Sequence, residues 1–115
     1  MNKQIAGLVN QQGGLAGEKI IKDMLKTLGY KVTQPPQNTP AFDLVAIKDN
    51  IGLLIQVKTD VNGNGKFPKP TKVQKNNLIK LAKKIGYVPI LINCDPKNNK
   101  YQAINMDGTI RDLEI

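Results

Sequence analysis

Apolar residues recur along this chain with two different periods, and the change from one period to the other divides it into elements. From Leu15 to Leu28 the apolar positions follow the spacing of one helix face: Ala16, Ile20, Ile21, Met24, Leu25 and Leu28. Asp23 and several lysines fill the other positions. Gly29 follows at the place where glycine commonly ends a helix. The pattern predicts an amphipathic helix over residues 15–28.

The helical period returns after a loop rich in Gly, Asn and Pro that covers residues 61–70. Thr71 has the side chain of an N-cap, and Gly86 is placed to end a helix that runs to about Ile85. The expected inner stripe is Leu78, Leu81, Ala82 and Ile85, and lysines cover much of the remaining surface. We expect a second amphipathic helix here.

Strand patterns lie between the two helices. Residues 30–33 are expected to form a short strand, and three prolines within residues 34–40 require a loop. Residues 41–47 are apolar on both faces apart from Asp43, as in a central strand, and residues 53–59 form another apolar run. The Asp-Asn pair between these two runs is typical of a tight turn. The two runs should therefore form a hairpin.

After the second helix, residues 87–93 are typical of a buried strand, 94–99 of a turn, and 100–106 of an alternating strand at an edge of the sheet. The expected order is helix, three strands, helix, two strands. This order predicts an α/β sandwich around one mixed sheet. The length of 115 residues fits a single domain over residues 1–115.

Charge is the unusual part of the composition. The chain has 17 basic and 9 acidic residues, for a net charge of +8, which favours a polyanionic partner such as nucleic acid. A lysine-rich surface that only keeps the protein in solution is the alternative. Arg111 is the only arginine, so contacts with phosphates are expected more than bidentate reading of guanine edges.

Other residue types exclude several function classes. Five aromatic residues, three Tyr and two Phe, are too few for a run of stacking platforms, which favours duplex or branched nucleic acid over a single strand. The lone Cys94 and the absence of His exclude a disulfide framework and a Cys/His zinc site. No apolar run is long enough to span a membrane, and the polar N-terminus lacks the apolar region of a signal peptide. We expect a cytoplasmic protein with no membrane partner and no small-molecule cofactor.

Gln56 and Lys58 interrupt the apolar run of residues 53–59 and share one face of the strand, because successive side chains alternate. The predicted turn pairs residues whose numbers sum to 99, so Asp43 lies opposite Gln56. A carboxylate and an amide oxygen there could hold Mg²⁺, or Mn²⁺, which prefer oxygen ligands. Lys58 could then orient or deprotonate an attacking water, or stabilise charge on a phosphate.

The alternatives for these residues are structural. Asp43 could be a strand-start acid beside a Pro-rich loop, and Gln56 and Lys58 could be the solvated end of a strand. A second acid would strengthen the metal hypothesis. Glu18 is the candidate, because it falls at the border of the apolar stripe of the first predicted helix.

Together, Gly17-Glu18, Phe42-Asp43 and Gln56-Val57-Lys58 resemble the motifs of the PD-(D/E)xK nuclease superfamily, most of all small archaeal-type Holliday junction resolvases and related nucleases of mobile elements. The resemblance implies a restriction-endonuclease-like αβββαβ core. It also implies a Mg²⁺-dependent endonuclease that hydrolyses phosphodiester bonds in branched DNA as a homodimer. By it, Asp43 and Glu18 are metal ligands, Lys58 is the catalytic lysine, and the Val57 carbonyl is a further ligand.

The sequence departs from the family pattern at two positions. Phe42 replaces the proline of the motif, which shapes the strand but holds no metal. Gln56 replaces an acid and removes a negative charge from the metal site. The rival functions are therefore a non-catalytic nucleic-acid-binding module with the nuclease fold, and a nuclease toxin or effector domain. The candidate nucleic-acid contacts are Lys19, Lys22, Thr39, Lys66, Lys69, Lys72 and Lys75.

Overall fold

The computed structural model describes residues 3–4, 15–35, 42–60, 62–98 and 100–114. It contains the helices α1 (Leu15–Thr27) and α2 (Lys72–Ile85). The strands are β1 (Lys3–Gln4), β2 (Lys31–Thr33), β3 (Leu44–Lys48), β4 (Ile51–Thr59), β5 (Val88–Asp95) and β6 (Lys100–Asn105). Neither helix is long and apolar enough to cross a membrane.

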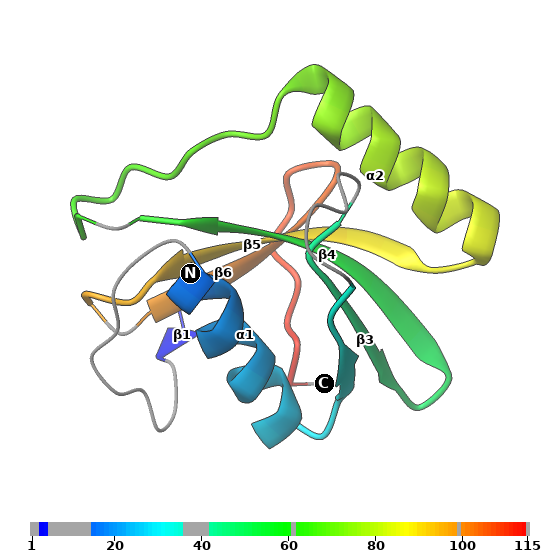
Figure 1. The fold of residues 1–115 in the computed structure, drawn as a ribbon, viewed down its shortest axis with the longest axis horizontal. Coiled ribbons are helices and arrows are strands. Elements are labelled where there is room, and N and C mark those ends of the chain that lie inside the picture. Colours follow the sequence, from blue (N-terminus) through cyan, green and yellow to red (C-terminus); the bar gives the residue numbers. More distant parts are fainter. Residues whose placement is uncertain (1–2, 5–14, 36–41, 61, 99, 115) are drawn as a thin grey trace.

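All six strands form one sheet in the order β1-β6-β5-β4-β3-β2. Only β4 and β5 pair in parallel, and α2 provides the crossover between them. Helix α1 covers one face of the sheet and α2 the other (Figure 1). The α/β class, the mixed sheet and the αβββαβ core that the sequence predicts are confirmed.

The β3–β4 hairpin has the predicted turn and register. Asp49 and Asn50 both have positive φ, 52° and 68°, as the centre of a type I′ turn requires. Paired residues run from Lys48 with Ile51 to Leu44 with Ile55. Asp43 lies just before β3, which starts later than the predicted strand of residues 41–47, and Ala41 lies outside the described residues.

The two faces of the sheet are packed unequally. Against α1 lies a large core that includes Ile21, Leu25, Leu53 and Ile55. Against α2 the buried cluster within the described part of the chain consists of Leu54, Leu78 and Ala82, with partly buried neighbours. Ile85 is 44% exposed, so its predicted place in the inner stripe is wrong, because it lies in the last turn of α2 beyond the edge of that cluster.

The helix ends follow the sequence signals. Thr71 forms a capping box with Gln74, in which each side chain accepts a hydrogen bond from the other residue's backbone N–H. Gly86 closes α2 in the left-handed conformation with φ 77°. These contacts fix the point at which α2 begins, directly after the loop that follows β4.

Two predictions at the far side of the sheet need correction. β5 continues to Asp95, so the turn begins later than predicted. β6 is not an edge strand, because β1 pairs with its outer side, and two residues are too short a strand for periodicity to reveal. The C-terminal tail is anchored by Leu113, which is buried and whose carbonyl accepts a hydrogen bond of 2.9 Å from the Tyr30 hydroxyl.

Candidate active site

Asp43 lies where the β3–β4 ladder ends. Its backbone N–H donates to the Ile55 carbonyl at 2.8 Å, and its carboxylate Oδ2 accepts from the Val57 backbone N–H at 2.8 Å. The side chain thus takes the ladder position that a further residue of β3 would fill. Asp43 is held against β4 from both its backbone and its side chain, which fixes the carboxylate at this edge.

The Val57 carbonyl points toward the same edge. In a strand the N–H and C=O of one residue point to the same neighbouring strand. Since the Val57 N–H reaches Asp43, its carbonyl oxygen also opens toward the Asp43 side of β4. The predicted further ligand therefore lies beside the predicted principal ligand.

Glu18 lies in the first turn of α1, close to the end of β4. Gly17 packs against Thr59 so closely that a Cβ on residue 17 would overlap the Thr59 hydroxyl oxygen. This contact brings the start of α1 onto β4, one residue beyond Lys58. Burial raises the pKa of Glu18, and the negative charge of Asp43 raises it further.

Asp43 responds to the same surroundings. Burial raises its pKa, while the Val57 N–H and the positive charge of Lys58 act in the opposite direction. Asp43 therefore lies within electrostatic range of both Glu18 and Lys58, although the three come from the start of β3, α1 and the end of β4. The structure brings together these three predicted site residues.

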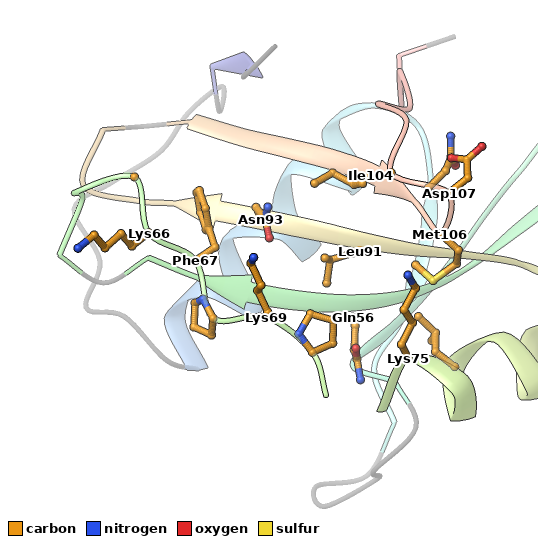
Figure 2. Close-up of a pocket in the computed structure, with 16 residues that line it drawn as sticks. Gln56, Lys66, Phe67, Lys69, Lys75, Leu91, Asn93, Ile104, Met106 and Asp107 are labelled. Carbon is orange, nitrogen blue, oxygen red and sulfur yellow. The ribbon is translucent and has the colours of Figure 1, made fainter. Parts of the chain in front are cut away.

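Gln56 lies on the opposite face of β4 from Val57. It is 5% exposed and lines a cavity of about 850 Å³ beside α2 (Figure 2). Its side-chain oxygen Oε1 is buried, with no hydrogen-bond partner in the described part of the chain. The predicted pairing of Gln56 with Asp43 does not form, because the ladder ends at Leu44 and Asp43 reaches Val57 instead.

The donor atoms fit a hard divalent cation. Glu18 and Asp43 are two partly buried carboxylates whose charges raise the cost of ionising them together, and a bound cation would remove that cost. The Val57 carbonyl adds a neutral oxygen, whereas the Gln56 amide lies in the cavity and is not part of this donor set. Within the described residues no three His, Cys, Asp or Glu side chains form a cluster that could hold a metal ion, so the donor set is poorer in charge than three carboxylates would make it.

The predicted nucleic-acid contacts divide into two groups. Lys66, Lys69 and Lys75 line the cavity, and Lys72 is exposed at the start of α2. Lys19 and Lys22 lie on α1, and the Lys19 ammonium is 3.9 Å from the Asp23 carboxylate, with both side chains mostly exposed. Thr39 lies outside the described residues.

Sequence reasoning missed two residues near the site. The Asp60 carboxylate accepts hydrogen bonds from the backbone N–H groups of Gly63 and Gly65 and so shapes the loop over the cavity. The signal was an Asp followed by glycines three and five positions later. Asn93 is a polar residue in a buried strand, the same signal that singled out Gln56, and it also lines the cavity.

Comparison with known proteins supports the fold. No family model and no curated protein sequence matches this chain. Among solved structures, the chain is similar to Hjc, a Holliday junction resolvase from the archaeal hyperthermophile Archaeoglobus fulgidus. The TM-score is 0.69 with 18% sequence identity over 82% of this chain and 73% of that chain. The chain therefore has the fold of an archaeal Holliday junction resolvase, which is the fold that the motifs predict.

Proposed function

From the fold it shares with a Holliday junction resolvase, we propose that this protein is a Mg²⁺-dependent endonuclease that hydrolyses phosphodiester bonds in branched DNA. The observation that supports the proposal most strongly is the grouping of Asp43, Glu18 and Lys58 at the end of β4, with the Asp43 carboxylate bonded to the Val57 N–H. Three separate elements supply these side chains. The grouping does not stabilise the sheet, because the partial burial of the Glu18 and Asp43 carboxylates costs desolvation free energy.

In the proposed mechanism Glu18, Asp43 and the Val57 carbonyl would hold the cation, while the Gln56 amide, which lines the cavity on the other face of β4, would not bind it. When bound, Mg²⁺ lowers the pKa of water and neutralises charge on the phosphate. The Lys58 ammonium donates hydrogen bonds to a non-bridging oxygen of the scissile phosphate and to the attacking water. Asp43, fixed by the Val57 N–H, keeps Lys58 oriented toward the reacting phosphate.

The basic residues supply the DNA contacts. The loop and helix that follow β4 carry four lysines: Lys66, Lys69, Lys72 and Lys75. A DNA phosphate backbone bound at Lys58 would continue along them. Lys19 and Lys22 on α1 contact phosphate from the other side of the site. A homodimer would present two such sites to a junction with twofold symmetry.

A cleavage assay tests the proposal. Purified protein is incubated with Mg²⁺ or Mn²⁺ and with a four-way junction, a linear duplex, a single strand and an RNA duplex. We expect the junction to be cut, and Lys58→Ala to lower the rate at least about 100-fold. Lys84→Ala, on the exposed last turn of α2, is the matched control. No cleavage of any substrate, or cleavage unchanged in Lys58→Ala, would contradict the enzyme.

A non-catalytic DNA-binding module is the second candidate, because the described residues place two carboxylates, and not three, at the site. Calorimetric titration with Mg²⁺ and Mn²⁺ separates the two candidates. The enzyme requires binding that is lost in Asp43→Asn, whereas the binding module would retain its affinity for DNA without any cation.

A further inference from the structure

The cavity beside Gln56 has an origin in the packing of the sheet. Helix α2 buries Leu54 on β4, while Leu91 on β5 and Ile104 on β6 are only partly buried and line the cavity. The loop of residues 62–70 passes over this part of the sheet on its way to α2 (Figure 1). The volume of the cavity, about 850 Å³, is in the range of small-molecule sites.

Two amide oxygens in this cavity have no hydrogen-bond partner among the described residues. Gln56 is 5% exposed, and its Oε1 is buried without a hydrogen bond; the Oδ1 of Asn93 is in the same state on the neighbouring strand β5. Both residues line the cavity in Figure 2. Buried polar atoms in proteins are nearly always paired, so these two oxygens are available to a polar group that enters the cavity. A side-chain amide carries a hydrogen-bond donor and an acceptor, so it can bind the edge of a planar ligand that also carries a donor and an acceptor.

The walls around the amides are apolar and the opening is basic. Phe67 on the loop offers an aromatic ring, and Leu91, Ile104 and Met106 offer apolar surface. Lys69 and Lys75 extend from the loop and the helix, whereas Lys66 points away from the cavity in Figure 2. Asp107 is the acidic member of the lining, and its carboxylate is engaged by the Thr109 backbone N–H at 2.9 Å and hydroxyl at 2.6 Å.

We propose that this cavity binds the base of an unpaired nucleotide in DNA, stacked on Phe67 and hydrogen-bonded by the Asn93 amide, with Lys69 and Lys75 on its flanking phosphates. A base has an apolar face and an edge of donors and acceptors, and its phosphates match the lysines. An apolar segment of a second protein copy would leave both amides unpaired. The proposal rests on DNA being the substrate, and it places the unpaired nucleotide next to the catalytic strand, since Gln56 and Lys58 are neighbours on one face of β4.

Binding in the absence of divalent cations tests this separately from catalysis. Fluorescence anisotropy in EDTA at one fixed salt concentration compares two labelled duplexes that differ only by a single unpaired adenosine nucleotide. We expect the duplex with the unpaired nucleotide to bind about tenfold tighter, the effect of stacking one base. Phe67→Ala and Asn93→Leu should each abolish most of this preference while leaving affinity for the fully paired duplex within about twofold. Val73→Ala, which shortens a 67% exposed side chain on α2 outside the cavity, should keep it.

Several outcomes would overturn the proposal. Wild-type protein that binds both duplexes equally, or a preference that survives in both Phe67→Ala and Asn93→Leu, would exclude the cavity as the site. Free dAMP that raises the melting temperature, while the two duplexes bind equally, would identify a mononucleotide ligand instead. Light scattering that shows either variant dissociating a wild-type dimer would assign this face to a subunit interface. If the wild type cleaves no substrate in Mg²⁺ but still prefers the duplex with the unpaired nucleotide, the proposed nuclease activity is refuted and the proposed base-binding cavity is not.

Discussion

The Asp43 carboxylate accepts a hydrogen bond of 2.8 Å from the Val57 backbone N–H. This bond joins the residue just before β3 to the last part of β4, where the candidate site lies. Asn at position 43 keeps an oxygen that accepts the same bond but lacks the charge that a cation requires. We expect Asp43→Asn to fold normally and to lose cleavage at least about 100-fold. Single-turnover kinetics on junction DNA measure the rate. Asp23→Asn, which changes an exposed acid on α1, should stay at the wild-type rate.

The burial of Glu18 and Asp43, with the Asp43 charge acting on Glu18, makes stability depend on pH when no metal is bound. Both pKa values are raised in the folded state, so the native protein holds protons that the unfolded chain has released. Their contribution is therefore fully present below about pH 4 and is lost as the pH rises through the raised folded values. Urea unfolding in EDTA, compared between wild type and Glu18→Gln/Asp43→Asn, should show the double variant gaining relative stability from pH 4 to 7. A constant difference across that range would contradict the electrostatic account.

Metal binding should reverse this penalty. Adding Mg²⁺ at neutral pH is expected to raise the melting temperature of the wild type, because a ligand that binds only the folded state stabilises it. The double variant should show no such increase beyond the effect of the same ionic strength of NaCl. An equal Mg²⁺ response in both proteins would place the cation elsewhere.

Gly17 allows α1 to pack directly against β4. Alanine in a helix normally gains about 1 kcal/mol over glycine, but here its Cβ would overlap the Thr59 side chain. We expect Gly17→Ala to destabilise the protein by about 1–3 kcal/mol and to slow cleavage, because Glu18 moves with the helix. Adding Thr59→Ala removes the obstructing atoms and should recover most of the stability. A Gly17→Ala variant that is more stable than the wild type would contradict the close contact between residue 17 and Thr59.

Cys94 should be chemically inert in the folded protein. Burial, and the charge of neighbouring Asp95, raise the pKa of its thiol to about 12. Labelling by a thiol-specific disulfide reagent at pH 8 is expected to proceed no faster than unfolding. Above about pH 9 the unfolded thiol ionises and the native one does not, so wild type should lose up to about 1.4 kcal/mol per pH unit relative to Cys94→Ala. Rapid labelling without denaturant would contradict the burial.

Asn93 offers a test that links stability to binding. Its Oδ1 is buried with no hydrogen-bond partner among the described residues, and such a group costs about 1–3 kcal/mol, so the similar-sized Asn93→Leu should stabilise the free protein by about 1 kcal/mol. Chemical denaturation measures the change. A destabilised variant would mean that Asn93 is structurally paired, and not retained for a ligand.

Most of the fold could be predicted from the sequence because its signals are local. The Asp49-Asn50 turn set the hairpin register, and Thr71 and Gly86 set the ends of α2, each through its own backbone conformation. The two-residue strand β1 could not be found, since its partner β6 is distant in sequence and two residues carry no period.

The candidate site was predictable to a similar extent. Asp43, Lys58 and Glu18 were singled out by the motif resemblance, and the charge of Asp43 acts on Glu18 while that of Lys58 acts on Asp43. The separation of Gln56 from Asp43 was not predictable, because it depends on where a ladder ends and on a side chain that takes the place of a backbone partner. The cavity also arises only in three dimensions, from a helix that covers part of one sheet face.

The loop over the cavity is tied to the neighbouring turn by Asn98, whose side-chain amide donates 2.9 Å hydrogen bonds to the Gly63 carbonyl and to the Asp95 carboxylate. At its other end the loop stops at the capping box of Thr71. None of these hydrogen bonds involves Glu18, Asp43 or Lys58. Residues 66–70 can therefore be replaced as one segment between fixed ends, which would alter the proposed DNA-contacting loop while the proposed catalytic residues stay unchanged.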